Sequence, residues 1–477
     1  MFSRFPWNNP IVSATSLLAL GALICAPGGL AAQTPQVPNA TGATASSFQG
    51  SVPQGEVSAN PLDLTLDDAI QRGLKNNLGV ILSGTQTAAA RGQRLSQLQA
   101  LLPTVDASGT EALNQVYLPA EGLRIPGFPT MIGPFGFVDI RASLTWSLVN
   151  VASMRNYLAA KHNFAAADLT AQNARELVVL TVGNAYLLAL ADESLVSSFE
   201  AQVATSKISL DQASANHQAG TAPKIDELRA RVDYQSLQQQ LIEAKNSLEK
   251  DKLALARTIG LPLAQSFNLA DKAPFSVFDQ LDLDAALKQA HANRKDLAAM
   301  VEQVKASQEQ RKAATDMRLP TITAKADYGV IGVNLGTSHG TGDASGTLIV
   351  PLFDEFALRG QAQEAQAELD TMQARLSDQN AQVDADVRDA LLDIVAAGKQ
   401  VEVARSSVEL AGEALSEAQQ RYANGVSDNL AVSQAEQSVA QANDQYVSSL
   451  YRHNIAKLSL ARALGAAENY KIYLGGK

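Results

Sequence analysis

The sequence predicts a mainly α-helical protein built from an internal duplication, with four β-strands that belong to a membrane β-barrel. Three observations lead to this prediction. The second half of the chain repeats the first, each half contains an uninterrupted helical pattern of roughly 67 residues, and two stretches in each half alternate polar with apolar residues. The 477 residues are 46% hydrophobic but only 5% aromatic, which suits long helices that pack closely.

Composition excludes several classes of protein. The single cysteine, Cys25, rules out a disulfide framework and a cysteine-rich metal site. A net charge of -10 argues against nucleic acid as a partner. The histidines are scattered without metal-ligand spacing, so we predict no catalytic, cofactor or metal site and no enzyme activity. They are His162, His217, His291, His339 and His453.

The N-terminus reads as an export signal. Arg4 is the only charged residue before Glu56, and residues 11–24 form an apolar stretch that is too short to span a bilayer. Small residues precede Gln33, so we predict a signal peptide over 1–32, whose removal takes Cys25 with it. Residues 33–60 are rich in Gly, Pro, Ser and Thr and predict a flexible leader.

The duplication sets the domain boundaries. The motif at 64–70 returns at 281–287, an offset of 217 residues, and later matches differ only because one loop is longer in the first half. The chain therefore divides into a first repeat, 61–280, a second repeat, 281–465, and a C-terminal tail, 466–477.

Each repeat predicts three helices. The first, over 66–101 or 284–318, ends at a Leu-Pro pair, and the second is a very long helix, over 152–218 or 356–423, without proline. A glycine-containing break follows, and a helix of about 36 residues returns along the chain. At 1.5 Å per residue the long helix measures ~100 Å and each shorter one ~54 Å, so two short helices match one long helix.

The long helices carry a diluted stripe of small and apolar residues on one side. On the second long helix this stripe includes Ala396, Val403 and Leu410. Small side chains at such positions allow a helix to pack against two neighbours, which predicts a curved wall of helices. An ordinary coiled-coil stalk is the alternative for the helices alone.

Four strands are predicted from alternation, and the polar side of two of them carries charges. In residues 137–149 apolar side chains alternate with Asp139 and Arg141, and Lys325 and Asp327 occupy the same kind of position in the second repeat. A charge facing lipid costs roughly 2–4 kcal/mol near the midplane, so these four residues are expected to face the lumen of a barrel. The strands span 104–117, 137–149, 321–333 and 344–353.

Four strands cannot close a barrel and leave two edges exposed, so the natural solution is an oligomer whose strands join in lipid. Three protomers would give twelve strands, although these arguments do not choose three over two or four. The glycine-rich segment 340–346 lies between strands and is interpreted as a hairpin turn rather than a phosphate site.

Several residues and segments together carry a family resemblance. They are the segment 66–70 with Asn76 and Asn77, the helix exits at Pro103 and Pro320, the segments 351–354 and 421–425, and Ala435. In this order and spacing the chain resembles the TolC family of outer-membrane efflux proteins from about 64 to 465. The resemblance implies a homotrimer with a twelve-stranded β-barrel in outer-membrane lipid and a helical α-barrel in the periplasm. It also implies an exit duct for small molecules, joined through a periplasmic adaptor, or membrane fusion protein, to an inner-membrane transporter.

The resemblance implies roles for residues at the two helix breaks. Asp226 and Tyr422 match the family's periplasmic gate, and Glu227 and Asp428 are expected to add negative charge there. The family's gate arginine and two acidic residues are replaced by Ser427, Ala431 and Gln434. The adaptor-contacting tips match Gly220, Thr221, Ala222, Gly425, Val426 and Ser427, for which plain helix caps are the alternative.

Two other functions are compatible with the same residues. One is the outer-membrane duct of a type I protein secretion system, for which the same tube serves. The other is a periplasmic coiled-coil protein that never enters the membrane.

Overall fold

The computed structural model describes residues 48–474 except 272–275, 277–280 and 428, and these residues belong to one structural unit, Ala43–Lys477. The predicted signal peptide, most of the leader and Asp428 lie outside the described residues. In the first repeat the helices are α2 (Leu66–Asn76), α3 (Leu78–Gln99), α4 (Val151–Gln218) and α5 (Lys224–Ile259). In the second they are α6 (Leu283–Asn293), α7 (Lys295–Asp316), α8 (Glu355–Ala423) and α9 (Asn429–Ala463), followed by the short α10 (Tyr470–Leu474).

The first helix of each repeat is broken, where the sequence predicts one continuous helix. Asn77 has extended backbone angles, φ -66° and ψ 133°, and its side chain accepts a hydrogen bond from the Gly79 amide at 2.9 Å. Asn is a strong N-cap residue, so it ends α2 and starts α3. Arg294 occupies the equivalent place, with φ -63° and ψ 120°, and separates α6 from α7.

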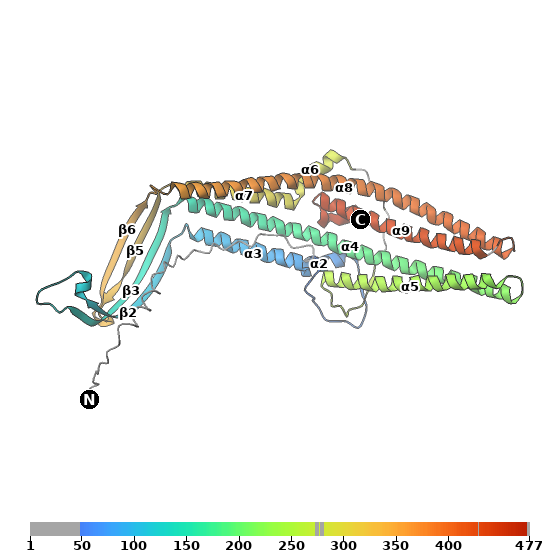
Figure 1. Cartoon of the computed structure of the whole chain (residues 1–477), viewed down its shortest axis with the longest axis horizontal. Coiled ribbons are helices and arrows are strands. Elements are labelled where there is room, and N and C mark those ends of the chain that lie inside the picture. The colour runs from blue at the N-terminus through green and yellow to red at the C-terminus, as the bar shows by residue number, and fades with distance from the viewer. Residues whose placement is uncertain (1–47, 272–275, 277–280, 428, 475–477) are drawn as a thin grey trace, which may run out of the picture. The chain divides into compact units, whose positions relative to one another are not determined.

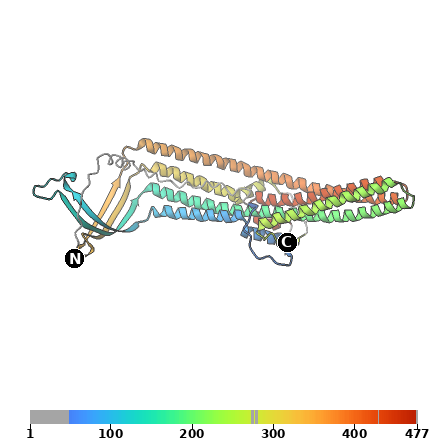
Figure 2. The same ribbon diagram turned by 60° about the horizontal axis from the view of Figure 1, so that its bottom comes forward.

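The helices lie side by side in a fixed order (Figures 1 and 2). Along its first half α4 packs between α3 and α7, and along its second half it packs between α5 and α9. The long α8 packs against α7 and then against α9. The layer therefore has two lateral edges, one formed by α3 and α5 and the other by α8.

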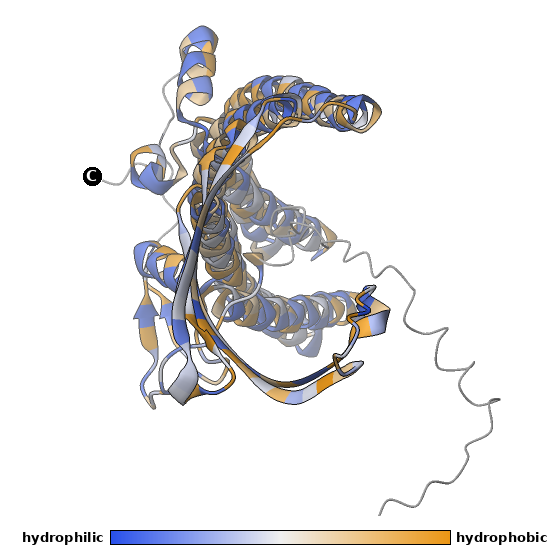
Figure 3. Ribbon diagram, turned by 90° about the vertical axis from the view of Figure 1, so that its left-hand side faces the viewer, coloured by the Kyte–Doolittle hydropathy of each residue, from blue (hydrophilic) through white to orange (hydrophobic). Residues whose placement is uncertain are grey.

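Four antiparallel strands form one curved sheet in the order β2-β3-β5-β6 (Figure 3). The pairing of β3 with β5 joins the two repeats, and β2 and β6 are the edge strands. Their bounds are β2 (Thr104–Tyr117), β3 (Met131–Val149), β5 (Thr321–Gly332) and β6 (His339–Ile349). The short β1 (Leu62–Leu64) and β4 (Phe267–Leu269) pair in parallel elsewhere.

The prediction for the last strand is wrong in position. Residues 340–346 lie within β6 rather than in a turn, and the chain reverses around a short 3₁₀ helix at Leu335–Thr337. Glycine is required here for packing, because a Cβ atom on Gly342 would lie 3.0 Å from the ring of Tyr328 on β5. Glycines that a neighbouring aromatic ring covers are compatible with a strand.

The main cores lie at the level of the helix breaks, one in each repeat. The first gathers Ile70 of α2, Val182 and Tyr186 of α4 and Leu255 of α5, all buried. Gly73 allows α2 to approach α4, since a Cβ there would lie 2.6 Å from Val182. The second core packs α6, α8 and α9 around a similar set of aliphatic side chains.

The prediction of a flexible leader does not hold for the part that the structure describes. Phe48 is buried against Gly79, and the Val52 amide donates a hydrogen bond to the Asn76 carbonyl at 2.9 Å. Burial of the Phe48 side chain therefore helps to hold the described part of the leader against the helices, although its Gly, Pro and Ser content suggested disorder.

Candidate functional site

The candidate site comprises the two helical turns at the ends of α4 and α8, the contacts just above them, and the polar face of the sheet. In each turn a glycine adopts the left-handed conformation, φ +78° at Gly220 and φ +70° at Gly425. A Cβ atom at either glycine would meet nothing within 4 Å, so the backbone angle, not crowding, requires glycine. The same type of backbone hydrogen bond closes both turns. The Thr221 amide donates to the Asn216 carbonyl at 2.9 Å, and the Val426 amide donates to the Arg421 carbonyl at 2.9 Å.

The turns leave the predicted adaptor-contacting residues accessible. Val426 is 69% exposed, so its apolar side chain is available to a partner. Gly220, Thr221 and Gly425 are also exposed, and Ala222 and Ser427 are half-buried.

Among the predicted gate residues that the structure describes, Asp226 and Glu227 have partners other than Tyr422. Asp226 is only 5% exposed and lies 3.8 Å from the Arg229 guanidinium of its own helix. Its carbonyl accepts a long hydrogen bond, 3.5 Å, from the buried Asn429 of α9. Glu227 forms an ion pair with Arg231 at 2.8 Å.

Tyr422 does not join this group. Its hydroxyl is buried, and it has no hydrogen-bond partner among the residues that the structure describes. No hydrogen bond or ion pair connects it to Asp226 within that part of the chain. The two family gate positions therefore lie on different hairpins without a direct link.

Two hydrogen bonds between repeats, which sequence reasoning missed, lie nearby. Ser433 of α9 donates a hydrogen bond to Asp233 of α5 at 2.5 Å, and Ser209 of α4 donates one to Glu436 of α9 at 2.6 Å. Burial raises the pKa of Glu436, the Ser209 hydrogen bond lowers it in part, and the charge of Asp233 adds to the rise. Each bond joins residues at least 200 positions apart, so only the packing of α9 against both α5 and α4 could have pointed to them.

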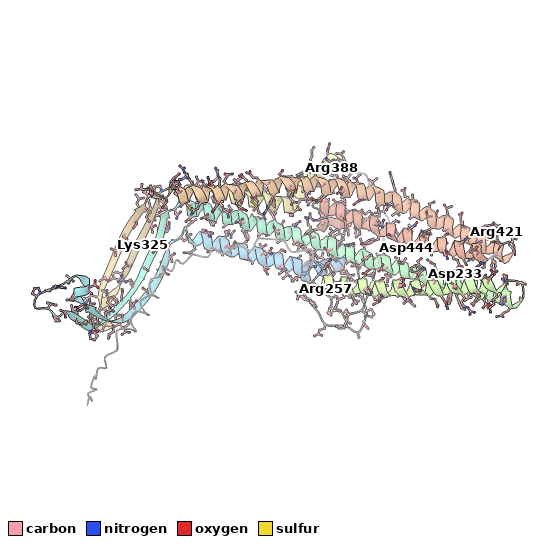
Figure 4. All side chains as sticks on the ribbon, viewed as in Figure 1. Asp233, Arg257, Lys325, Arg388, Arg421 and Asp444 are labelled. Carbon is pink, nitrogen blue, oxygen red and sulfur yellow. The ribbon has the colours of Figure 1, made fainter. Side chains whose placement is uncertain are left out.

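A groove of about 350 Å³ runs between α5 and α9 beside these bonds. Figure 4 labels Asp233 on α5 and Asp444 on α9, two of its lining residues. Leu237 and Phe199 supply apolar surface, and Glu436 is the third carboxylate in the lining.

At the level of the helix breaks a buried ionic network ties α7 to α8 and α9. The Arg294 guanidinium lies 2.6 Å from Asp296 and 2.5 Å from Asp386, and Arg462 lies 3.3 Å from both Asp296 and Glu176. Burial would raise the pKa of Asp296, but the hydrogen bond from Arg294 and the charge of Arg462 hold it below its usual value.

The strand register places the four predicted charges on one face of the sheet. Arg141 lies 2.7 Å from Asp139 and 3.0 Å from Asp327 on the neighbouring strand. Lys325, labelled in Figure 4, is paired with Thr145 on the same face, and it is exposed.

Within the described ranges, no group of three or more His, Cys, Asp or Glu residues could hold a metal ion. Among the helices of those ranges, α4 is long and apolar enough to cross a membrane by length and composition. However, 56% of its most apolar window is buried inside the protein, as in a core helix.

Solved structures share this fold. The outer membrane protein VceC of Vibrio cholerae superposes with a TM-score of 0.74 at 19% identity, covering 84% of this chain and 96% of that chain. The CmeC outer membrane channel of Campylobacter jejuni gives a TM-score of 0.75 at 18% identity, covering 90% of this chain and 95% of that chain. The fold is therefore that of outer-membrane channels, as the sequence predicts.

Sequence relatives lead to the same class. The toluene efflux pump outer membrane protein TtgF of Pseudomonas putida is 23% identical over 414 residues, 84% of this chain and 83% of its own length. The outer membrane protein TolC of Escherichia coli is 22% identical over 339 residues, 68% of each chain. The family model described as outer membrane efflux protein matches residues 69–261 and 286–466. The chain belongs to this family, which confirms the predicted resemblance and the outer-membrane location.

Proposed function

We propose that the protein is the exit duct of a tripartite efflux system, a homotrimer that couples to a periplasmic adaptor and an inner-membrane transporter and exports small molecules. The observation that carries the proposal is the continuity of the fold. A sheet with two free edges leads directly into helices long enough to reach away from a membrane, and the helices end in two exposed turns. Such a structure can conduct molecules, and its exposed turns can be contacted by a partner protein.

The edge strands support the oligomer. Nearly every residue of β2 and every residue of β6 is exposed, whereas β3 and β5 are paired on both sides. Unpaired backbone groups are costly in lipid, so β2 of one protomer would pair with β6 of the next until the barrel closes. With four strands each, three protomers give the twelve-stranded barrel that the resemblance implies.

The polar face of the sheet supports an assignment of which side of the barrel wall would face the lumen. Asp139, Arg141, Lys325 and Asp327 would line the lumen, while the opposite face, with Ile140, would contact lipid. Arg141 forms ion pairs with both Asp139 and Asp327, so this face would present a polar surface to the water of the lumen.

The helical ends support coupling to an adaptor. We assign Gly220, Thr221, Ala222, Gly425, Val426 and Ser427 to adaptor contact, and Asp226, Glu227, Tyr422 and Asp428 to the neighbourhood of the gate. The relatives named as efflux pump components favour small molecules as cargo over secreted proteins.

An accumulation assay tests the proposal. Cells that lack the chain should retain a fluorescent apolar dye several-fold more than wild-type cells, and the full chain supplied in trans should restore export. Unchanged dye retention, together with loss of a protein from the culture medium, would favour the protein secretion duct. Unchanged retention with no change in secreted proteins would reject both duct functions.

A further inference from the structure

A polar groove runs between α8 and α9 near the level of the helix breaks. It consists of two adjoining cavities of about 450 and 330 Å³, which share Gln400 of α8 and Arg452 of α9 in their linings. On α9 the lining extends from Asp444 to Ser459, a length of ~22 Å. We call it the α8–α9 groove. Cavities of this volume accommodate small organic molecules.

The α8–α9 groove opens on the concave side of the helical layer. Leu391 and Gly398 of α8 line a different cavity, beside Leu283 at the start of α6, whereas Asp393 and Gln400 line the groove. Two residues correspond to about 200° of rotation around a helix, so the two cavities lie on opposite sides of α8. Figure 3 shows the curved layer with α6 on its convex side. The groove therefore lies on the concave side, which faces the interior of the proposed duct.

Two cations line the α8–α9 groove without a partner of their own. Lys399 of α8 and Arg452 of α9 are both exposed, and neither forms an ion pair or hydrogen bond with any residue of the described ranges. Arg405 on the same face-exposed helix behaves differently, since it pairs with Glu409 at 3.4 Å. Lys399 and Arg452 are therefore available to an anion from solution.

The two cations lie at the same height, although they come from different helices. A Cβ atom on Gly398 would lie 3.8 Å from Cε1 of His453, which fixes the register of α8 against α9. Helix α8 runs toward the turn at Gly425 and α9 runs away from it. Lys399 and Arg452 are each one residue, or ~1.5 Å, closer to that turn than the Gly398–His453 contact. Their side chains can thus act on one ligand.

The carboxylates of the groove lie at other heights. Asp444 is eight residues, or ~12 Å, closer to the turn than Arg452, and Asp393 is six residues, or ~9 Å, farther from it than Lys399. Both separations exceed the Debye length of about 8 Å at physiological ionic strength, so these exposed carboxylates offset the two cations only weakly. The middle of the groove is positive in a chain whose net charge is -10.

Neutral hydrogen-bond donors surround the two cations. Gln400, Gln445 and Ser448 line the groove, and within the part of the chain that the structure describes their side chains have no hydrogen-bond partner. The hydroxyls of Ser407 and Ser449 donate instead to carbonyls of their own helices. A guanidinium fork, an ammonium and amide donors together suit the two oxygens of a carboxylate.

We propose that Lys399 and Arg452 form an anion-binding site on the inner wall of the duct, which recognises small organic molecules that carry a carboxylate. The inference rests on the proposed function and adds to it a class of cargo. Gln400, Gln445 and Ser448 supply the neutral hydrogen bonds of the site. Each protomer carries one such groove, so the wall of the duct holds a positive belt at this height.

Binding of a fluorescent anion tests the site. The probe is carboxyfluorescein, whose fluorescence anisotropy is followed with the purified full chain in a nonionic detergent. Rhodamine 123, a cationic dye with a similar ring system, is the comparison. The wild type should bind carboxyfluorescein more tightly than rhodamine 123, and added salt should weaken that binding. Equal binding of the two dyes, or tighter binding of rhodamine 123, would overturn the proposal.

Substitutions locate the site. Arg452→Gln and Lys399→Gln should each weaken carboxyfluorescein binding about 10-fold, whereas Arg452→Lys, which keeps the charge, should weaken it less. Arg405→Gln is the matched control, because it removes one cation from α8 outside the groove and should leave binding unchanged. Circular dichroism checks that each variant keeps its helices. Equal weakening in Arg405→Gln and Arg452→Gln would overturn the proposal, since binding would then follow net charge alone.

The apolar-dye assay keeps this proposal apart from the proposed function. Retention of the apolar dye that depends on the chain, together with a wild type that does not bind carboxyfluorescein, would reject the anion site and leave the duct. Retention that does not depend on the chain would reject the duct itself, and with it any role of the site in export.

Discussion

Ser433 of α9 donates a hydrogen bond to Asp233 of α5 at 2.5 Å, which joins the two helical hairpins of one protomer near their free ends. The two residues come from different repeats and lie 200 positions apart. This bond and the one from Ser209 to Glu436 both join the hairpins, which also pack through α4 against α9. We expect opening of the duct at this end to break both bonds.

Ser433→Ala should therefore favour the open state. Removing a hydrogen bond to a charged group costs about 1.5–3 kcal/mol, which shifts a closed-open equilibrium roughly 10- to 150-fold. The measurement is single-channel conductance in planar bilayers, where the variant should open more often than the wild type. Ser438→Ala is the control, since the Ser438 hydroxyl bonds only to the Gln434 carbonyl of its own helix. Equal open times for both variants would show that the bond does not restrain the duct.

The side chain of Asp192 in α4 interacts with that of Asp251 in α5, and both burial and this neighbour favour a proton on Asp192. Burial and this neighbour raise the pKa of Asp192 to about 7, and Tyr451 of α9 faces the same pair. A folded-state pKa above the unfolded value means that stability is greatest below about pH 4 and declines as the pH rises to about 7. The contribution of Asp192 to the free energy of unfolding of the wild type should therefore fall across that interval and level off above it.

Asp192→Asn should remove this pH dependence and make the variant more stable than the wild type at pH 8. Thermal unfolding, monitored by circular dichroism at pH 5 and at pH 8, measures the pH dependence of stability and the stability at pH 8. Asp211→Asn is the control, because Asp211 is exposed and pairs only with Lys207 of its own helix. A wild-type slope that survives in Asp192→Asn would assign the pH dependence to another group.

Gly425→Ala should destabilise the turn by roughly 1–2 kcal/mol, the cost of placing a Cβ atom in the left-handed region. Gly412→Ala should have the opposite sign and stabilise α8 by about 0.5–1 kcal/mol, since Gly412 is helical and a Cβ there meets nothing within 4 Å. The melting temperature of each variant, compared with that of the wild type, tests the two predicted shifts. Similar shifts in both variants would contradict the backbone argument.

Arg294→Met should cost about 1.5–3 kcal/mol, because it removes the cation that hydrogen-bonds the half-buried Asp296 and Asp386, although Arg462 still lies 3.3 Å from Asp296. Arg388→Met is the matched control on the exposed side of α8, labelled in Figure 4, and should change stability by less than about 0.5 kcal/mol. Urea unfolding of the detergent-solubilised protein compares the two. A small effect of Arg294→Met would mean that the network contributes little to the second helix break.

The sequence predicted the long helices and most of the strand positions because each depends on local periodicity. The breaks at Asn77 and Arg294 were not predicted. Asn77 caps α3 locally, but the contacts that hold its side chain and that of Arg294 in place also come from other segments. The strand that contains Gly340 and Gly342 was missed for a related reason. Glycine weakens a strand unless a ring such as that of Tyr328 covers it, and that ring comes from another strand.

The site was less predictable than the fold. The turns at Gly220 and Gly425 follow from glycine and the helix lengths on either side. The hydrogen bonds of Ser433 and Ser209 depend on which helices lie together at which height, and no local pattern contains that information. Residue correspondence with a family also did not predict that Asp226 contacts Asn429 rather than Tyr422.

The central claim is that the protein is a duct whose exposed turns meet a periplasmic adaptor. Replacing Ser427 with cysteine places a single reactive group at one turn, and a photo-crosslinker attached there can be irradiated in intact cells. We predict capture of a periplasmic adaptor that belongs to an inner-membrane transporter, identified by mass spectrometry, and no such capture when the same label is placed at Leu392→Cys, far from the turns. Efficient labelling at Ser427→Cys in an exported, folded protein without any adaptor in the cross-linked material would contradict the account.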